Sequence, residues 1–349
     1  MENFISVLEK SYSKIADTYF CDKNLTEGYW SNLEKNEQVL LLSQLDRKTS
    51  MEVVNNLFPQ LEEIIFDPMR AVGLRLLDIK PNEHGVDYGC MWGNLLIYAA
   101  NNCEAMLGID QTKESLAFVN HRLKEERIGN CYLLNANLRD DLPFSEMFDF
   151  AIINGVLEWV AEDNQVELEK FLSRSRFKLI SPRENPRNIQ LRFLEMVRNN
   201  LKTNGRMYLA IENRYDYQHF LWKRDPHPNI YYTAFLPRKV SNLICNFWFG
   251  RPYVNYLYSF GELENLVKEA GFDEVEKYAV FPDYRFPIKI IPLDKYDNND
   301  YEPVYNLVQT SDIKKKIFHR IRREIDNIIY KKLKLLYFAP SIIIIARKG

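Results

Sequence analysis

The sequence has no excess of positive charge, no paired cysteine motif and no long apolar run. Its 349 residues carry 46 Lys and Arg against 48 Asp and Glu, so the formal net charge is −2 and no overall positive field attracts nucleic acid. The five cysteines lack C-x-x-C spacing, which argues against a disulfide framework and a structural zinc site. No run approaches the ~20 apolar residues that span a bilayer, and the first residues lack the pattern of a secretory signal. We therefore expect a cytoplasmic protein, and the sequence predicts no metal site.

Strands and helices alternate along most of the chain. Residues 1–80 have the apolar spacing of helices and predict a helical N-terminal cap region. After residue 81, short apolar runs alternate with amphipathic helical patterns, and the runs predicted as strands are 84–87, 105–110, 131–134, 148–154, 206–212, 274–281 and 341–346. This order predicts an α/β fold: a Rossmann-like, seven-stranded, mostly parallel sheet with helices on both faces.

The other segments are predicted as insertions in a single domain that spans residues 81–349. They lie at about 160–190, 213–258 and 282–336, and the second is rich in aromatic residues and arginine. Because the strand 341–346 follows all of them, we expect the insertions to interrupt one sheet rather than to form a separate domain.

A glycine-containing turn follows the first predicted strand, in the segment from Asp87 to Gly93. The first glycine, Gly89, allows a sharp turn, and Gly93 allows the backbone to approach a ligand where a Cβ atom would collide. Asp110 ends the next strand 23 positions after Asp87, close to the offset of about 20 residues at which a carboxylate meets ribose hydroxyls. The turn alone marks only a nucleotide-like ligand, because similar turns join strands to helices in proteins that bind nothing.

Two asparagines extend this pattern along the edge where ligands of open α/β sheets bind. Asn137 follows the third strand, where it can meet an adenine edge, and Asn154 ends the fourth. A dehydrogenase uses similar glycines and a similar carboxylate, but it needs a third glycine beneath its pyrophosphate, and here Leu96 and Ile97 follow instead. A Rossmann-like sheet that has lost its cofactor is the other alternative.

These motifs resemble, in order, those of the class I S-adenosylmethionine-dependent methyltransferases. The matching segments are the D-x-G-x-x-x-G turn from Asp87, Gly108–Asp110, Leu142–Phe144 followed by Phe148 and Asp149, and Asn154–Glu158. The resemblance covers roughly residues 80–281 and the last strand. Met91 departs from it, because many members have a glycine at that position.

The resemblance implies S-adenosylmethionine as the cofactor and assigns a role to each motif. Gly89 and Gly93 would pass beneath the methionine and ribose parts, and Asp110 would hold the ribose hydroxyls. Asn137 and Leu138 would meet the adenine, while Asp87 and Asn154 would lie near the amino-acid end. The full predicted set of cofactor contacts is Tyr19, Asp87, Gly89, Cys90, Gly93, Asp110, Gln111, Asn137, Leu138 and Asn154.

Tyr19 enters this set through the segment from Ser11 to Tyr19. It resembles the Y-x-x-I-A-x-x-Y segment that folds across the bound cofactor in many family members, although here it lies further upstream. An ordinary amphipathic helix with tyrosines at its edge is the alternative.

Acceptor-binding residues are expected after the fourth and fifth strands. Methyl transfer from a sulfonium needs the acceptor to be aligned and, for a hydroxyl, a group that removes its proton. The candidate bases are His227, which lies between two prolines, His219 and Glu158. Each histidine could equally be a surface or structural residue, and Glu158 could cap a helix.

The aromatic and arginine-rich stretch from residue 215 to 258 suggests the kind of acceptor. It resembles a bacterial subgroup of class I methyltransferases associated with cell-surface polysaccharide gene clusters, through segments such as Asn185–Arg187, Ala210–Arg214, Leu236–Arg238 and Gly250–Tyr253. That resemblance implies a sugar or glycan-precursor acceptor. The alternative is a helical lid whose aromatic residues pack onto the domain.

The sequence therefore predicts a methyltransferase that acts on oxygen of a sugar, a glycan precursor or a related small polar metabolite. An RNA methyltransferase is the alternative enzyme, although the near-neutral charge argues against nucleic acid. A non-catalytic partner subunit with the same fold is the third hypothesis. The basic helix expected at 312–336 could make a peripheral contact with an anionic membrane or present a solvated face. The oligomeric state is not predicted.

Overall fold

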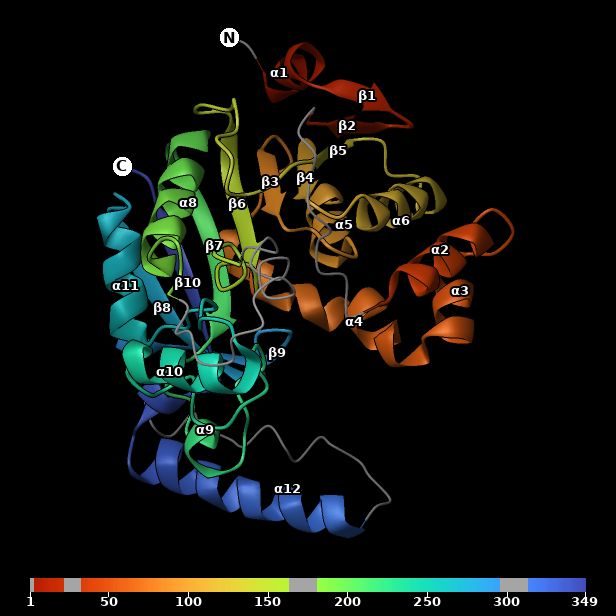
Figure 1. The fold of residues 1–349 in the computed structure, drawn as a ribbon. Coiled ribbons are helices and arrows are strands. Elements are labelled where there is room, and N and C mark those ends of the chain that lie inside the picture. Colours follow the sequence, from red (N-terminus) through yellow and green to blue (C-terminus); the bar gives the residue numbers. More distant parts are fainter. Residues whose placement is uncertain (1–2, 22–32, 163–180, 296–312) are drawn as a thin grey trace.

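The computed structural model describes residues 3–21, 33–162, 181–295 and 313–349, with side chains in the last range from residue 320 onward. These residues form a ten-stranded sheet in the order β1-β2-β5-β4-β3-β6-β7-β10-β8-β9 (Figure 1). The α/β, Rossmann-like and mostly parallel fold predicted from the sequence is confirmed, and the sheet is larger than the predicted seven strands.

All seven predicted strands are present and adjacent in the sheet. They are β3 (His84–Tyr88), β4 (Ala105–Asp110), β5 (Cys131–Asn135), β6 (Phe148–Asn154), β7 (Leu201–Glu212), β8 (Glu274–Asp283) and β10 (Ser341–Arg347). The strands β5, β4, β3, β6 and β7 run parallel, and β10 lies antiparallel between β7 and β8. The chain leaves β3 for β4 on one side and later returns to β6 on the other, so the strand order reverses at β3.

The three additional strands lie at the two edges, where the seven-stranded prediction was wrong. They are β1 (Ser13–Ile15), β2 (Thr18–Phe20) and β9 (Phe286–Pro292). A two-residue turn joins β1 to β2, and its residues Ala16 and Asp17 both have positive φ, as in hairpin turns whose twist matches that of the strands. Region 1–80 is therefore not entirely helical. Proline is tolerated in β9 because the strand lies at the edge of the sheet.

Helices cover both faces of the sheet because successive strand residues point to opposite sides. One face packs against α1 (Phe4–Ser11), α8 (Pro186–Asn200) and α11 (Phe260–Glu269), and the other against η2 (Pro68–Leu77), α5 (Asn94–Ala100) and α6 (Lys113–Glu125). Along β6, Ala151 and Ile153 belong to the first core, whereas Phe150 and Ile152 belong to the second.

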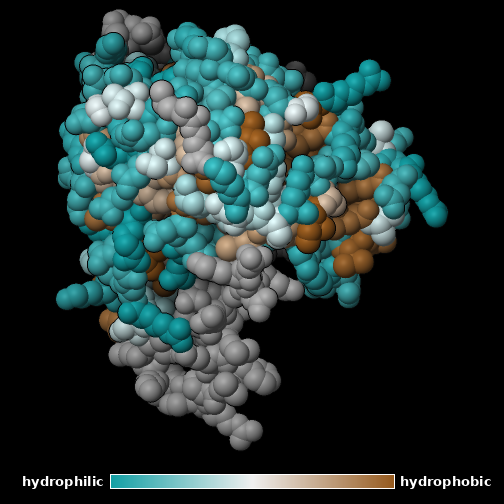
Figure 2. Space-filling view, turned by 90° about the horizontal axis from the view of Figure 1, so that it is seen from above, coloured by the Kyte–Doolittle hydropathy of each residue, from teal (hydrophilic) through white to brown (hydrophobic). Residues whose placement is uncertain are grey.

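A small helical group lies beside the second face, and its own core contains Trp92 of the glycine turn. The group consists of α2 (Lys35–Gln44), α3 (Ser50–Leu57), η1 (Pro59–Leu61) and α4 (Glu62–Phe66). The rings of Trp92 and Phe118 meet edge to face at 5.0 Å, and Arg122 donates to the carbonyls of both Trp92 and Ile65. Hydrophobic surface is visible from above on the side where α2 and α3 lie (Figure 2).

The insertions contribute α9 (Gln218–Leu221), α10 (Arg238–Phe249), η3 (Leu293–Lys295) and α12 (Ile313–Asp326), followed by the π-helix Asn327–Lys332 and the short η7 (Leu336–Phe338). The predicted basic helix 312–336 is therefore α-helical as far as Asp326 and continues as a π-helix to Lys332. Much of the insertion predicted at 160–190, and part of the one at 282–336, lies outside the described residues. Among the described helices, none is both long and apolar enough to cross a membrane.

Candidate functional site

The glycine turn between β3 and α5 is held against the end of β4. Gly89 and Gly93 have φ values of +75° and +79°, a region that favours glycine. The backbone N–H groups of Gly89 and Cys90 both donate to the carbonyl of Ile109, at 2.8 and 3.1 Å. A Cβ atom on Gly89 would lie 2.6 Å from Cγ2 of Val156, so only glycine fits there. The predicted turn is thus a defined loop at the point where the strand order reverses, the usual ligand position in such sheets.

Met91, which replaces a glycine found in many members of the family, is stabilised in a left-handed conformation by its neighbours. Its φ is +46°, and its N–H donates to Oδ2 of Asp110 at 2.9 Å. Its carbonyl accepts a hydrogen bond from the Ser115 hydroxyl. The other carboxylate oxygen of Asp110 accepts from the Thr112 N–H at 2.8 Å. Asp110 therefore shapes the loop.

Two buried carboxyl groups lie at this end of β3 and β4. Burial and the nearby Asp110 carboxylate raise the pKa of Asp87 to about 7, and the positive charge of Arg70 opposes that rise. Burial raises the pKa of Asp110 to about 6, although hydrogen bonds from Thr112 and Met91 favour its ionised form. Such shifts mark a candidate functional site because buried charges are otherwise avoided.

Several buried polar atoms near these carboxyl groups have no hydrogen-bond partner among the described residues. They include Nδ2 and Oδ1 of Asn154 and Nη1 of Arg70. Buried polar groups are rarely left unpaired, so these atoms indicate a polar ligand. S-adenosylmethionine fits them, because it carries an ammonium group that suits Asp87 and a carboxylate that suits Arg70. Arg70 was not predicted from the sequence, since nothing in its local sequence distinguishes it.

The other predicted cofactor contacts lie around β5. Oδ1 of Asn137 accepts from the N–H of Arg139 at 3.0 Å, and Leu138 packs against the first core. Gln111 is half-buried directly after β4. Tyr19 is buried in β2, which lies on the side of β5 away from β4, in register with Leu134. Their contacts with the cofactor remain predictions.

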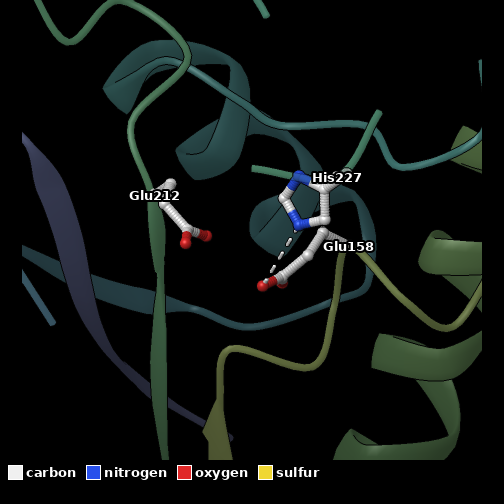
Figure 3. A group of neighbouring side chains, drawn as sticks. All are labelled: Glu158, Glu212 and His227. Carbon is white, nitrogen blue, oxygen red and sulfur yellow. Dashed lines mark ion pairs between the residues drawn. The ribbon is translucent and has the colours of Figure 1, made fainter. Parts of the chain in front are cut away.

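A second group of polar side chains gathers where β6 and β7 end. Glu158 follows β6, Glu212 ends β7, and His227 lies in the loop after α9, and these three side chains point toward one another (Figure 3). One ligand atom from each lies within 4.8 Å of the others. Nε2 of His227 is 4.0 Å from Oε1 of Glu158. The structure thus brings together two of the three predicted catalytic candidates and adds Glu212, which was not among them.

His227 is fixed by a carboxylate on its other side. Its Nδ1 is 3.0 Å from Oδ1 of Asp225, which is itself fully buried. The other oxygen of Asp225 accepts from the hydroxyls of Tyr253 and Thr233, at 2.9 and 3.2 Å. Burial alone would lower the pKa of His227, but Asp225, Glu212 and Glu158 raise it to about 9. Burial and the facing Glu212 carboxylate raise the pKa of Glu158 to about 8.

His219 lies outside this group. It is fully buried, and neither ring nitrogen has a hydrogen-bond partner within the described ranges. Burial lowers the pKa of this histidine below its usual value. A catalytic role for His219 remains a prediction.

The aromatic insertion around this group contains both buried and exposed side chains. Arg214 is structural, because it pairs with Glu262 and donates to the carbonyls of Ala234 and Leu236. The guanidinium of Arg238 lies 4.4 Å from the ring centroid of Tyr256. The exposed aromatic residues of the insertion are Phe220, Tyr231, Tyr232, Phe247, Trp248 and Phe249. The insertion therefore combines a packed layer with an exposed aromatic surface.

One part of the chain matches a family of known proteins. Residues 86–175 match the family model of the methyltransferase domain. That match covers the glycine turn, Asp110 and the end of β6, so this part of the chain is similar to a methyltransferase domain.

The curated relatives match over a short segment. A 23S rRNA (uracil(1939)-C(5))-methyltransferase RlmD from Vibrio cholerae is 29% identical over 85 residues, which is 24% of this chain and 19% of that protein. The same protein from a second strain is 27% identical over 85 residues, with the same coverage. The chain thus matches less than one fifth of the length of these relatives.

Solved structures show more extensive but more distant similarity. Phosphoethanolamine N-methyltransferase 2 from Haemonchus contortus, in complex with S-adenosyl-L-methionine, has 13% identity and a TM-score of 0.45, covering 88% of this chain and 60% of that one. A SAM-dependent methyltransferase from Aquifex aeolicus has 16% identity and a TM-score of 0.39, covering 67% of this chain and 93% of that one.

Proposed function

We propose that this enzyme transfers a methyl group to a hydroxyl oxygen of a sugar, a glycan precursor or a related small polar metabolite. The observation that carries the proposal is the buried group of Glu158, Glu212 and His227 at the carboxyl ends of β6 and β7. Glu158 of this group follows Asn154 by only a few residues, and Val156 between these two residues reaches the glycine turn. An acceptor at this group therefore lies beside the cofactor site.

The residues around the glycine turn bind and orient the methyl donor. When bound, S-adenosylmethionine supplies a methyl group on a positively charged sulfur, which already reacts with nucleophiles. Asp87 would hold its ammonium group, Arg70 its carboxylate and Asp110 its ribose hydroxyls. The unpaired amide of Asn154 provides a further donor and acceptor at the end of β6. These residues fix the position of the donor, so that alignment of the acceptor becomes the remaining requirement.

The second group of side chains suits a hydroxyl acceptor. A hydroxyl must lose its proton as it is methylated, and a buried group of two carboxyls and an imidazole provides sites for that proton. The exposed aromatic residues of the insertion offer faces on which sugar rings can stack.

An RNA acceptor is the second candidate, and one observation favours it. The relatives that match over 85 residues are named as 23S rRNA methyltransferases. The segment from Ile313 to Asp326 is also rich in Lys and Arg, which suits a phosphate backbone. The net charge of −2 weighs against it.

Contact with a membrane through residues 312–336 would suit a lipid-linked glycan precursor. Among the described side chains of this segment, Ile321, Ile328 and Leu333 are about half exposed, and Lys331 and Lys332 are also exposed. Apolar and basic side chains together favour the surface of an anionic bilayer. Co-sedimentation with anionic and with neutral vesicles tests this contact, and equal, weak binding to both would contradict it.

The acceptor class can be tested with radiolabelled S-adenosylmethionine. We expect the protein to label a glycan fraction of cell extract, with the label released by glycosidase and retained after ribonuclease. Heat-inactivated protein and the Asp110→Ala variant are the controls, and both should transfer no label. Label lost after ribonuclease would replace the sugar acceptor with RNA. Binding of S-adenosylmethionine without any transfer would favour the non-catalytic partner subunit.

A further inference from the structure

We propose that Glu158, Glu212 and His227 form a binding site for a single divalent cation. The three side chains come from three separate segments and converge at the carboxyl ends of neighbouring strands (Figure 3). No metal-ligand spacing is visible in the sequence, because Glu158 and Glu212 are brought together only by the pairing of β6 with β7. The site is therefore a property of the folded sheet.

The two carboxyl groups lack the partners that buried charges require. Glu158 is fully buried and Glu212 is 4% exposed. Both side-chain oxygens of Glu158, and Oε2 of Glu212, have no hydrogen-bond partner in the described part of the chain. Within the same residues, no Lys or Arg pairs with either carboxyl, and the ion pair that Glu158 makes is the 4.0 Å contact with Nε2 of His227. A buried carboxylate without a partner is costly, so a positive species belongs between these two.

His227 is oriented as a metal ligand. Its Nδ1 faces Asp225, so its Nε2 points toward Glu158. Ligating histidines commonly use their second nitrogen in this way, because a carboxylate there fixes the ring and strengthens the ligand. Asp225 is in turn held by hydrogen bonds from the hydroxyls of Tyr253 and Thr233.

The ligands favour a first-row divalent ion. Carboxylates suit Mn²⁺ and Mg²⁺, imidazole suits Zn²⁺ and other transition ions, and two carboxylates balance a charge of +2. Ligand atoms about 2.1 Å from a cation lie roughly 3–4 Å from one another. The observed atoms lie within 4.8 Å of one another, so small side-chain rotations of Glu158 and Glu212 would complete the site.

The role of the cation rests on the proposed function, whereas its binding does not. A bound cation has further coordination positions that an acceptor hydroxyl can occupy. Coordination lowers the pKa of that hydroxyl, so its proton passes to water more readily and the oxygen becomes a better nucleophile. With a cation bound, Glu158, Glu212 and His227 act as its ligands rather than as proton acceptors, and the cation holds the acceptor near the end of β6.

Titration of EDTA-treated full-length protein with MnCl₂, in the absence of S-adenosylmethionine and of any acceptor, tests the site directly. We expect one Mn²⁺ to bind, and Glu158→Gln and Glu212→Gln each to weaken that binding by at least tenfold. Asp225→Asn should weaken it by about 10- to 100-fold through the orientation of His227. Asp326→Asn is the matched control, because it changes a buried carboxyl outside the group and should leave Mn²⁺ binding unchanged.

Thermal unfolding and S-adenosylmethionine titration of each variant separate loss of the site from loss of the fold. Retained donor binding with lost Mn²⁺ binding supports the proposal. Absence of Mn²⁺, Mg²⁺ and Zn²⁺ binding to the folded wild type would overturn it and leave a carboxyl pair that shares a proton. Undiminished Mn²⁺ binding to both Gln variants would overturn it as well. Neither outcome affects the proposed methyl transfer, which is measured by labelling.

Discussion

The backbone N–H of Met91 donates to Oδ2 of Asp110 at 2.9 Å, which joins the glycine turn to the end of β4. Asp110 thus supports the loop as well as providing the carboxylate predicted to meet the ribose. Its replacement should therefore affect both the stability of the protein and binding of the donor.

We expect Asp110→Ala to abolish S-adenosylmethionine binding and to lower the free energy of unfolding by about 1–3 kcal/mol, because two N–H groups lose their acceptor. Asp110→Asn keeps one acceptor oxygen and should cost less stability. Calorimetric titration and urea unfolding provide the two measurements. Asp149→Asn, at the opposite end of the sheet, is the control. Normal donor binding by Asp110→Ala would contradict the assigned pocket.

Gly89→Ala should disrupt the same loop by a different route. The new Cβ would collide with Val156, and the φ of +75° is unfavourable for alanine. Strain of this kind costs about 1–3 kcal/mol, so we expect a lower thermal midpoint and weaker donor binding. Gly129→Ala is the matched control, because a Cβ there would meet nothing within 4 Å. Equal effects of the two substitutions would show that Gly89 has no special role.

Donor binding should depend on pH through Asp87. Its pKa of about 7 in the unbound protein means that it is largely protonated at pH 6. The ammonium group of the donor favours the ionised carboxylate, so affinity should rise as pH increases from about 5 to 7 and level off above. In the unbound protein, the stability of the fold depends on the ionisation of Asp87 with the opposite sign. Because the folded pKa lies above the unfolded one, the Asp87 contribution to stability falls as pH rises between about 4 and 7.

Asp87→Asn removes this titration and is the direct comparison. Calorimetric titrations in buffers of different ionisation enthalpy at pH 6 should show proton release for the wild type and less for the variant. An affinity that is independent of pH in the wild type would mean that Asp87 does not face the ammonium group.

Arg70→Met should weaken donor binding by about tenfold, the loss expected when one charged contact worth about 1.4 kcal/mol is removed. The substitution keeps most of the apolar side-chain volume, so the packing of η2 should change little. Arg75→Met, on an exposed position of the same helix, is the control. If both variants bind the donor like the wild type, the unpaired Nη1 of Arg70 serves another ligand.

The central sheet was predictable because its strands are continuous apolar runs buried on both faces. The edge strands were not, because β1 and β2 are three residues each and carry little hydrophobic pattern. Their hairpin depends on the left-handed conformations of Ala16 and Asp17, which are residues that rarely indicate such a turn. The strand β9 was not predicted because it contains prolines, and proline is tolerated in a strand only at the edge of a sheet.

The candidate site was predictable to the extent that its residues follow strands. Asp87, Asp110, Asn154 and Glu158 were identified because strand ends meet at one edge of a parallel sheet. Arg70 reaches the site from a helix outside the recognised motifs, so its role depends on packing that only the three-dimensional structure reveals. Glu212 also lies at the end of a predicted strand. Its closeness to Glu158, however, follows from the pairing of β6 with β7, which the sequence alone does not show.

The position of β10 affects how the protein is made. This strand fills the space between β7 and β8, yet it is synthesised more than 50 residues after β8, which ends at Asp283, whereas β10 begins at Ser341. Until then, β7 and β8 each present an unpaired edge that can associate with other chains. The sheet of the nascent protein therefore stays divided until β10 has been made, and a chaperone that shields these edges would improve the yield of the protein.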